Sequence, residues 1–186
     1  MSLPRLLLLT DRSQLPPGAS LIGHLAACID AGATHIVVRE LDLAPSERAV
    51  IVEDLNRLGA AVQCARERVV GAAGLHQAST VRGPAQGLTG RSCHTADEVA
   101  IAAADGCDYV TLGPFATSES KPGYGPALPA IAYAARSIWT YALGGVTSAN
   151  AEHAREAGAD GVAVMGAVMR STDPGALVAD LLRRIS

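Results

Sequence analysis

Aromatic residues are scarce in this sequence: they make up 3% of its 186 residues, whereas hydrophobic residues make up 49%. The apolar content is rich in Ala, Val and Leu, which is typical of a buried parallel sheet covered by Ala-rich helices. Long apolar runs are also missing, because Leu6 to Leu9 is far shorter than the ~20 residues that a membrane-spanning helix needs. The N-terminal stretch has no basic segment followed by a long apolar one, so we expect no secretion signal and a cytoplasmic protein.

Clusters of cysteine and of basic residues are absent as well. The four cysteines are scattered, with no C-x-x-C pair among Cys28, Cys64, Cys93 and Cys107. This pattern predicts free thiols rather than a zinc site or a disulfide framework. The net charge is −3, the sequence pI is about 5.9, and no basic patch stands out. Nucleic acids and anionic membrane surfaces are therefore poor candidates for partners.

Short apolar runs alternate with helix-like segments along the chain, and no linker or low-complexity stretch divides it. We therefore predict a single domain over residues 1–186. Alternation of strands and helices predicts a parallel sheet, and eight strands favour a closed (β/α)₈ barrel, with an open doubly wound sheet as the alternative. The expected strands are residues 6–10, 35–38, 60–64, 74–76, 87–92, 109–113, 140–143 and 161–165.

The chain is short of the ~250 residues typical of such a barrel, and the shortage falls in its middle. Between the third and fourth expected strands there is room only for a stunted helix, Glu67 to Val70. Residues Ser79 to Gln86 contain Gly83-Pro84 and too few apolar residues for a crossover helix. We predict a barrel trimmed around its third and fourth βα units. A homodimer is one way of covering the apolar patch that such trimming exposes.

The stretch from Thr140 to Ala167 reads as a buried strand, a Gly-Gly turn, a helix, a second buried strand and another glycine turn. Gly144 and Gly145 let the backbone pass close to a ligand at a point where a Cβ would clash. Gly166 follows the next strand in the same way, directly after Met165. Two glycine turns at the carboxyl ends of successive strands can present backbone N–H groups to one anion. We therefore predict a phosphate site here, although either turn alone would be read as a tight βα connection.

In a barrel the chemistry sits at the carboxyl ends of the strands, so the residues that follow each apolar run are the candidates. His94 follows the fifth expected strand, and histidine is the side chain best suited to proton transfer near neutral pH. Lys121 lies in a Gly-, Ser- and Pro-rich loop that can fold over a bound phosphate; the alternative is a solvated loop lysine. The strand-end candidates are Asp11, Arg12, Arg39, Glu40, Cys64, Arg66, His76, Gln77, Ser92, His94, residues 117–124, Gly144, Gly145, Met165 and Gly166.

Several of these positions belong to an ordered set of motifs. In chain order the motifs are residues 10–12 (TDR), 32–34 (GAT), 39–40 (RE), 90–95 (GRSCHT), 105–110 (DGCDYV), 113–115 (GPF), 117–125 (TSESKPGYG), 144–146 (GGV) with Asn150, and 157–164 (AGADGVAV). The set resembles the thiamine phosphate synthase superfamily over nearly the whole chain. The resemblance implies a (β/α)₈ barrel that binds thiazole phosphate and works in thiamine biosynthesis.

The superfamily holds two activities, and the sequence departs from the first. Thiamine phosphate synthases couple a pyrimidine pyrophosphate to thiazole phosphate and use acidic ligands for Mg²⁺ after the third and fourth strands. Here the third strand exits into residues 63–66 (QCAR), where the family pattern has an Asn-Asp pair, and the fourth into residues 76–79 (HQAS), where it has Gln-Glu-Asp. Both positions lack a carboxylate, and only Glu67 lies near. Val37 and Leu41 also stand where the pattern has a Gln and a Lys, so a pyrophosphate contact is missing.

The resemblance therefore favours the other branch, the thiazole tautomerase, whose fifth strand also ends in Gly-Arg-Ser-x-His. That reaction moves a proton on thiazole carboxylate phosphate and needs one acid/base group and no metal or other cofactor. On this interpretation His94 is the acid/base group, and Ser92 orients it or the substrate carboxylate. The predicted substrate- and phosphate-binding residues are Arg39, Thr117, Lys121, Gly144, Gly145, Met165 and Gly166.

Three alternatives to the tautomerase stay open. A thiamine phosphate synthase would need Mg²⁺. A barrel that lost its metal ligands could bind thiazole or thiamine phosphates as a regulator without turnover. A different phosphosugar isomerase on the same barrel predicts no affinity for thiazole phosphate at all.

Overall fold

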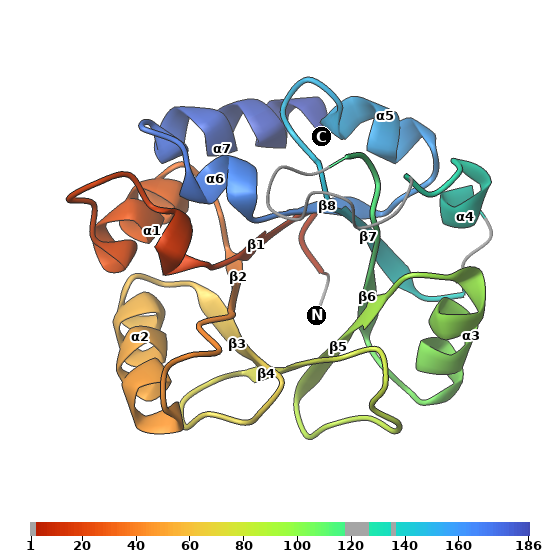
Figure 1. Ribbon diagram of the computed structural model, residues 1–186, viewed down its shortest axis with the longest axis horizontal. Helices are drawn as coiled ribbons and strands as arrows, with labels where there is room; N and C mark the ends of the chain where they lie inside the picture. The colour runs from red at the N-terminus through yellow and green to blue at the C-terminus, as the bar shows by residue number, and fades with distance from the viewer. Residues whose placement is uncertain (1–2, 118–126, 135–136) are drawn as a thin grey trace.

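The computed structural model describes residues 3–117, 127–134 and 137–186. Eight parallel strands close a barrel in sequence order, and β8 pairs back onto β1 (Figure 1). This closure confirms the predicted (β/α)₈ barrel and excludes the open sheet. The strands are β1 (Leu6–Leu9), β2 (His35–Val38), β3 (Ala61–Ala65), β4 (Gly74–Gln77), β5 (Leu88–Cys93), β6 (Tyr109–Leu112), β7 (Trp139–Leu143) and β8 (Gly161–Val164).

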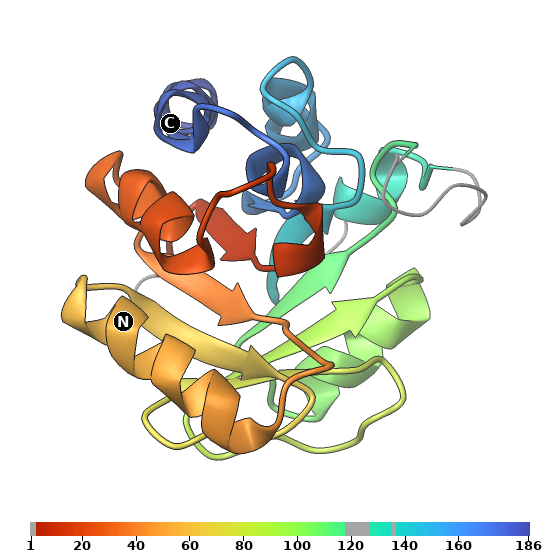
Figure 2. The same cartoon turned by 60° about the vertical axis from the view of Figure 1, so that its left-hand side comes forward.

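Helices surround the barrel and begin where the sequence supplies caps (Figures 1 and 2). The side chain of Ser20 accepts from Gly23 N–H at the start of α1, and Thr95 accepts from Glu98 N–H at the start of α3. Pro45 occupies the first turn of α2, where its missing N–H costs nothing. The helical elements are η1 (Arg12–Gln14), α1 (Leu21–Asp30), α2 (Pro45–Arg57), α3 (Ala96–Ala104), α4 (Ile131–Ala134), α5 (Ala151–Glu156), α6 (Gly166–Met169) and α7 (Pro174–Arg184).

The predicted trimming is confirmed at β4. Residues 66–73 and 78–87 are all described, and both connections are loops without a helix, as the lower edge of Figure 1 shows. The expected stunted helix from Glu67 to Val70 is therefore wrong. Arg66 has φ +70°, which turns the chain away from a helical path directly after β3. The Glu67 side chain is held in an ion pair with Arg48 of α2.

Buried arginines fill the space on this side of the barrel. Arg48 is 1% exposed and donates to the Ala65 carbonyl over 3.1 Å, in addition to its ion pair with Glu67. Arg91 of β5 is also 1% exposed. It donates to Gln77 Oε1 over 3.0 and 2.9 Å, and it pairs with Asp105 over 2.5 Å. Buried charges persist only when they are paired and hydrogen-bonded, and both arginines have an ion pair and a hydrogen bond, although Arg48 Nε has no partner among the described residues.

The helix expected over residues 127–136 is shorter at its start. It begins at Ile131. Pro129 disfavours helical geometry for the residue before it, and its carbonyl accepts from Ala132 N–H in the first turn. The helix can therefore form only beyond this proline.

Two hydrophobic cores hold the barrel together. The larger one lies between the strands and the surrounding helices, and the smaller one fills the barrel interior. Tyr109 and Tyr141 meet edge to face inside the barrel, with ring centroids 5.4 Å apart. Wide aromatic rings thus help to fill the barrel interior, while Phe115 and Tyr133 pack in the larger core. All four cysteines are free and buried, as predicted. None of the helices formed by the described residues has the length and apolar character that crossing a bilayer requires.

Candidate active site

A cavity of about 760 Å³ opens at the carboxyl ends of the strands. Its described lining includes most of the predicted site, which comes from five different strands or their exits. Lys121, and with it the loop segment 118–125, lies outside the described residues. The predicted residues that line the cavity are Arg39, Ser92, His94, Thr117, Gly144, Gly145, Met165 and Gly166. Their roles stay predictions, but the barrel gathers them around one space.

The turn after β7 has the geometry of an anion cup. Gly144 and Gly145 have φ +93° and +65°, which other residues rarely adopt. A Cβ on Gly145 would lie 2.4 Å from the Thr117 carbonyl oxygen, so that position also needs a glycine for space. Within the described part of the chain the N–H groups of Gly144, Gly145 and Val146 donate no hydrogen bond, although they border the cavity. Such backbone donors are what a phosphate binds.

Asn150 fixes the shape of this turn. Its side-chain oxygen accepts from Thr147 N–H over 2.8 Å, and its amide donates to the Gly145 carbonyl over 2.9 Å. The two bonds hold the Gly145 carbonyl on the Asn150 side of the turn. The cup is thus preorganised by a side chain that does not itself line the cavity.

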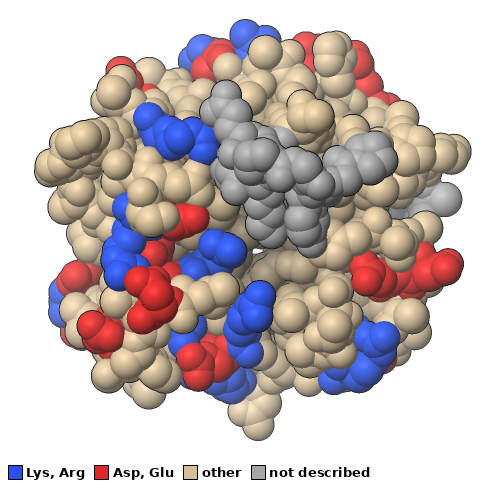
Figure 3. Space-filling view, viewed as in Figure 1, with Lys and Arg blue, Asp and Glu red and all other residues tan. Residues whose placement is uncertain are grey.

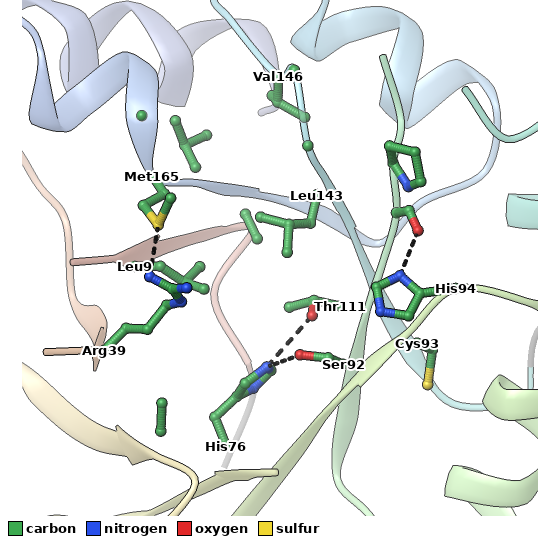
Figure 4. A pocket seen from close by; sticks show the side chains of 18 of the residues that line it. Leu9, Arg39, His76, Ser92, Cys93, His94, Thr111, Leu143, Val146 and Met165 are labelled. Atoms are coloured by element: carbon green, nitrogen blue, oxygen red, sulfur yellow. Dashed lines mark hydrogen bonds between the residues drawn. The ribbon is translucent and has the colours of Figure 1, made fainter. Parts of the chain in front are cut away.

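The floor beside the cup is apolar. Leu9, Leu143 and Ala163 line it at the ends of β1, β7 and β8, and Arg39 reaches over it from β2 (Figure 4). The Arg39 guanidinium lies 4.0 Å from the Met165 sulfur and 3.8 Å from an Asp11 oxygen. A flat heterocycle could rest on such a floor while a charged tail enters the cup.

His94 stands on the opposite wall, at the exit of β5. Its Nδ1 lies 3.0 Å from the Gly113 carbonyl oxygen. Because a carbonyl can only accept, Nδ1 carries the proton of this bond, and Nε2 is the basic nitrogen of the neutral ring. The sequence predicted that Ser92 orients either His94 or the substrate carboxylate, and in the structure the His94 ring is hydrogen-bonded to a backbone carbonyl instead.

The Ser92 hydroxyl instead meets His76, which the sequence named among the strand ends but did not place in the site. Ser92 Oγ lies 3.0 Å from His76 Nε2 (Figure 4). On the other side of the ring, the Tyr109 hydroxyl lies 3.1 Å from His76 Nδ1. Tyr109 donates in turn to Gln63 Oε1 over 3.0 Å. These groups come from β3, β4, β5 and β6, so only the closed barrel brings them together. The sequence carries only a partial signal for this hydrogen-bonded group: polar residues stand at inward positions of strands that are otherwise apolar.

The direction of this chain of hydrogen bonds can be derived. Tyr109 has one proton, which it gives to Gln63, so His76 Nδ1 must donate to the Tyr109 oxygen. His76 Nε2 is then an acceptor and receives the proton of Ser92. Burial lowers the pKa of His76 to about 4, so the ring is neutral at pH 7. Ser92 therefore presents oxygen lone pairs to the cavity, which suit a ligand N–H better than a ligand acceptor.

The cavity wall at β3 and β4 is positively charged, whereas the floor beside the cup is apolar. Arg66, Ser79 and Thr80 line it, and none of the described lining residues of the whole cavity is an Asp or Glu. No cluster of three or more His, Cys, Asp or Glu that could hold a metal ion occurs among the residues that the structure describes. Mg²⁺ prefers carboxylate and other oxygen ligands, so this donor set does not fit the cation that the resemblance implies for a synthase.

Some strand-end candidates lie outside the cavity. Asp11, Arg12 and Glu40 border a separate hollow, where Arg12 pairs with Glu40 over 3.0 Å and with Asp42 over 2.7 Å. Cys64 points outward into the larger core. These residues therefore lie beside the site and not in the lining of its cavity.

Comparison with known proteins places the chain in a family. A sequence model of the family described as thiamine monophosphate synthase matches residues 68–168. The thiamine-phosphate synthase of Marinobacter nauticus is 34% identical over a region that covers 88% of this chain and 82% of that protein. This chain belongs to the thiamine monophosphate synthase family.

Other relatives of the family are longer than this chain. The thiamine-phosphate synthase of Thermosynechococcus vestitus is 39% identical over 53% of this chain, which corresponds to 29% of that protein. The one from Synechocystis is 30% identical over 91% of this chain and 55% of that protein. The matched regions therefore span less than two thirds of the length of these cyanobacterial synthases.

Solved structures support the fold. Thiamine phosphate pyrophosphorylase from Pyrococcus furiosus superposes with a TM-score of 0.83 over 97% of this chain and 95% of its own, at 21% identity. The geranylgeranylglyceryl phosphate synthase from Thermoplasma acidophilum, solved with its substrate sn-glycerol-1-phosphate, gives a TM-score of 0.75 over 97% and 92%, at 13% identity. At these identities the likeness extends to the barrel and not to the chemistry.

Proposed function

We propose that this protein is a thiamine phosphate synthase, which joins thiazole phosphate to a pyrimidine pyrophosphate. The observation that carries the proposal is the match to the Marinobacter nauticus synthase across most of both chains. The sequence ranked the thiazole tautomerase first because the metal carboxylates are missing. The relatives reverse that ranking, since the ones named above are called synthases.

The site offers each step of this reaction a group of its own. The N–H groups of Gly144, Gly145 and Val146 would hold the phosphate, and the floor of Leu9 and Leu143 would support the thiazole ring. The ring nitrogen attacks the carbon that bears the pyrophosphate, a C–N bond forms, and the C–O bond breaks as pyrophosphate leaves with its electron pair. No proton moves on the thiazole ring, so the protein's task is positioning and neutralisation of the leaving charge.

A thiazole tautomerase is the second candidate, and the geometry of His94 favours it. The bond from Nδ1 to Gly113 leaves Nε2 as the basic nitrogen at the wall of the cavity, as a proton-transfer step requires. The two candidates differ in how much they need this ring. A synthase can do without a general base, whereas a tautomerase cannot.

One pair of assays with one pair of variants separates them. Purified protein is incubated with thiazole phosphate and pyrimidine pyrophosphate, and thiamine phosphate is measured by mass spectrometry. In parallel, the proton shift of thiazole carboxylate phosphate is followed by NMR. We expect thiamine phosphate to form and His94→Ala to keep that rate within about tenfold, because the step needs no base at the ring.

The matched control is His153→Ala, which removes an exposed histidine of α5 outside the cavity lining. If no thiamine phosphate forms while the proton shift is catalysed and His94→Ala slows it by about 100-fold or more, the tautomerase replaces the synthase. Binding of thiazole phosphate without either reaction would make the protein a regulator and overturn both enzymatic functions.

A further inference from the structure

The cavity carries positively charged side chains in addition to the backbone N–H groups of the phosphate cup. Its described lining contains three arginines, Arg39, Arg66 and Arg170, and no carboxylate. Figure 3 shows Lys or Arg atoms bordering the hollow near the centre of this face. A cavity so charged attracts a ligand with more than one anionic group. Although the metal ligands of the family pattern are missing, the arginines of the cavity can bind anions.

Among the residues that the structure describes, one of the three arginines has no protein partner. Arg39 contacts Met165 and Asp11, and Arg170 donates to Gln14 over 2.5 Å. The Arg66 side chain is exposed, and its guanidinium makes no hydrogen bond or ion pair with the described residues, so its five N–H groups are available to solvent or to a ligand. It stands at the exit of β3, where the family pattern places a metal-binding pair.

The backbone of Arg66 is also held in an unusual conformation. Its φ of +70° is the only positive φ among the described residues other than glycine. Its N–H donates to the His76 carbonyl over 2.9 Å, which ties the residue to the end of β4. A non-glycine residue in this region is strained, and such strain clusters at functional sites. The strained backbone fixes where the side chain enters the cavity.

The neighbours of Arg66 are suitable for the same task. Ser79 and Thr80 line the cavity at the exit of β4, and their hydroxyls can donate to an anion. A guanidinium presents a planar fork that matches two phosphate oxygens and remains charged at any physiological pH. At a pyrophosphate site a Mg²⁺ ion held by carboxylates can supply the positive charge. Here the Arg66 side chain supplies the positive charge, so carboxylates that would bind a metal ion are not needed.

We propose that Arg66, with the hydroxyls of Ser79 and Thr80, binds the pyrophosphate group directly and without a divalent cation. The identity of this group rests on the proposed function. The phosphate of the thiazole occupies the cup at Gly145, and the pyrophosphate of the second substrate lies at the opposite wall. The enzyme then neutralises the leaving pyrophosphate with a fixed guanidinium.

The test is isothermal titration of inorganic pyrophosphate into the whole protein, once with EDTA and once with excess MgCl₂. We expect binding in EDTA, and no gain in affinity with Mg²⁺. Arg66→Ala weakens pyrophosphate binding by about 10- to 100-fold, the usual range for a charge-assisted pair of hydrogen bonds. Inorganic phosphate, which fits the cup alone, binds both forms equally. The control Arg57→Ala removes an exposed arginine at the end of α2 and changes neither affinity.

Either of two results overturns the proposal: pyrophosphate that binds only with Mg²⁺, or an Arg66→Ala protein that binds it as tightly as the natural chain. Circular dichroism establishes that the variant is folded. The outcome is distinguishable from that of the proposed function. Metal-free, Arg66-dependent binding without formation of thiamine phosphate supports this site and refutes the synthase. Formation of thiamine phosphate that requires Mg²⁺ supports the synthase and refutes this site.

Discussion

The two sides of the cavity are built by different means. On the β7–β8 side the polar groups that border the cavity are backbone N–H groups in a turn that two glycines and Asn150 shape. On the β3–β4 side they are side chains, namely Arg66, Ser79 and Thr80, on loops that have replaced the usual helices. A backbone cup keeps its chemistry as long as the turn is kept. A wall of side chains changes its chemistry with each substitution, so this is the side on which relatives can diverge.

The family match divides the chain after β3. The family model matches residues 68–168, which hold β4 to β8 and the cup. Residues before 68, which hold β1 to β3, Arg39 and Arg66, fall outside that match. The matched part holds the cup together with Ser79 and Thr80 of the β3–β4 wall, and the likeness to the Marinobacter nauticus synthase extends over 88% of the chain. Arg66, the residue that we propose binds pyrophosphate, lies outside the part that the family model matches.

The largest effect on stability is expected at Arg91, a buried arginine on the trimmed side of the barrel. Arg91→Ala removes a buried guanidinium and leaves Gln77 Oε1 without its donor, so we expect the free energy of unfolding to fall by about 3 kcal/mol. Urea denaturation measures this. Arg57→Ala, whose ion pairs are exposed, should leave stability unchanged within error. Equal effects of the two changes would mean that Arg91 does not hold the trimmed wall together.

The cup should be sensitive to a single methyl group. Gly145→Ala would place a Cβ 2.4 Å from the Thr117 carbonyl oxygen, so the turn must move. We expect the affinity for inorganic phosphate to fall by about 100-fold, because a displacement of about 1 Å is enough to lose an aligned site. Gly18→Ala is the control, since Gly18 also has a positive φ but no atom within 4 Å of its Cβ position. Unchanged phosphate affinity in Gly145→Ala would remove the cup from the mechanism.

The buried histidine of β4, His76, should make stability depend on pH. Burial lowers the pKa of His76 from 6.5 to about 4 in the folded protein. Between these values the unfolded chain binds a proton that the folded chain does not, so the free energy of unfolding falls as the pH falls. We expect His76 to account for about 2–3 kcal/mol of the loss between pH 7 and pH 4.5. His76→Gln should reduce the loss by that amount in urea denaturation, and an identical pH dependence in both proteins would contradict the assignment.

How far the sequence predicts the site follows the same division. Glycine turns are visible in a sequence because few residues can replace them, so the cup at Gly144, Gly145 and Gly166 could be placed before the structure. The bond from Ser92 to His76 could not, because it joins strands whose inward faces meet only when the barrel closes. The proposed role of Arg66 could not be predicted from the sequence for another reason. A positive φ at an arginine has no sequence signal, and a helix was expected one residue later.

The smallest effect tests whether Arg66 is placed for binding at the expense of stability. Arg66→Gly relieves the strain of a φ of +70°, which stabilises the folded protein. The greater entropy of glycine in the unfolded chain offsets part of this gain, so we expect a net stabilisation of about 0.5–1 kcal/mol. Arg66→Ala removes the same guanidinium but keeps a Cβ, so it should bring no such gain. Both variants should lose pyrophosphate affinity alike, because both lack the charge. Stability that rises only in the glycine variant, while affinity falls in both, would mean that the strain belongs to the backbone and the function to the side chain. A glycine variant less stable than the natural protein would instead mean that the guanidinium supports the fold, and the β3–β4 wall would then be structural, as Arg48 and Arg91 already are.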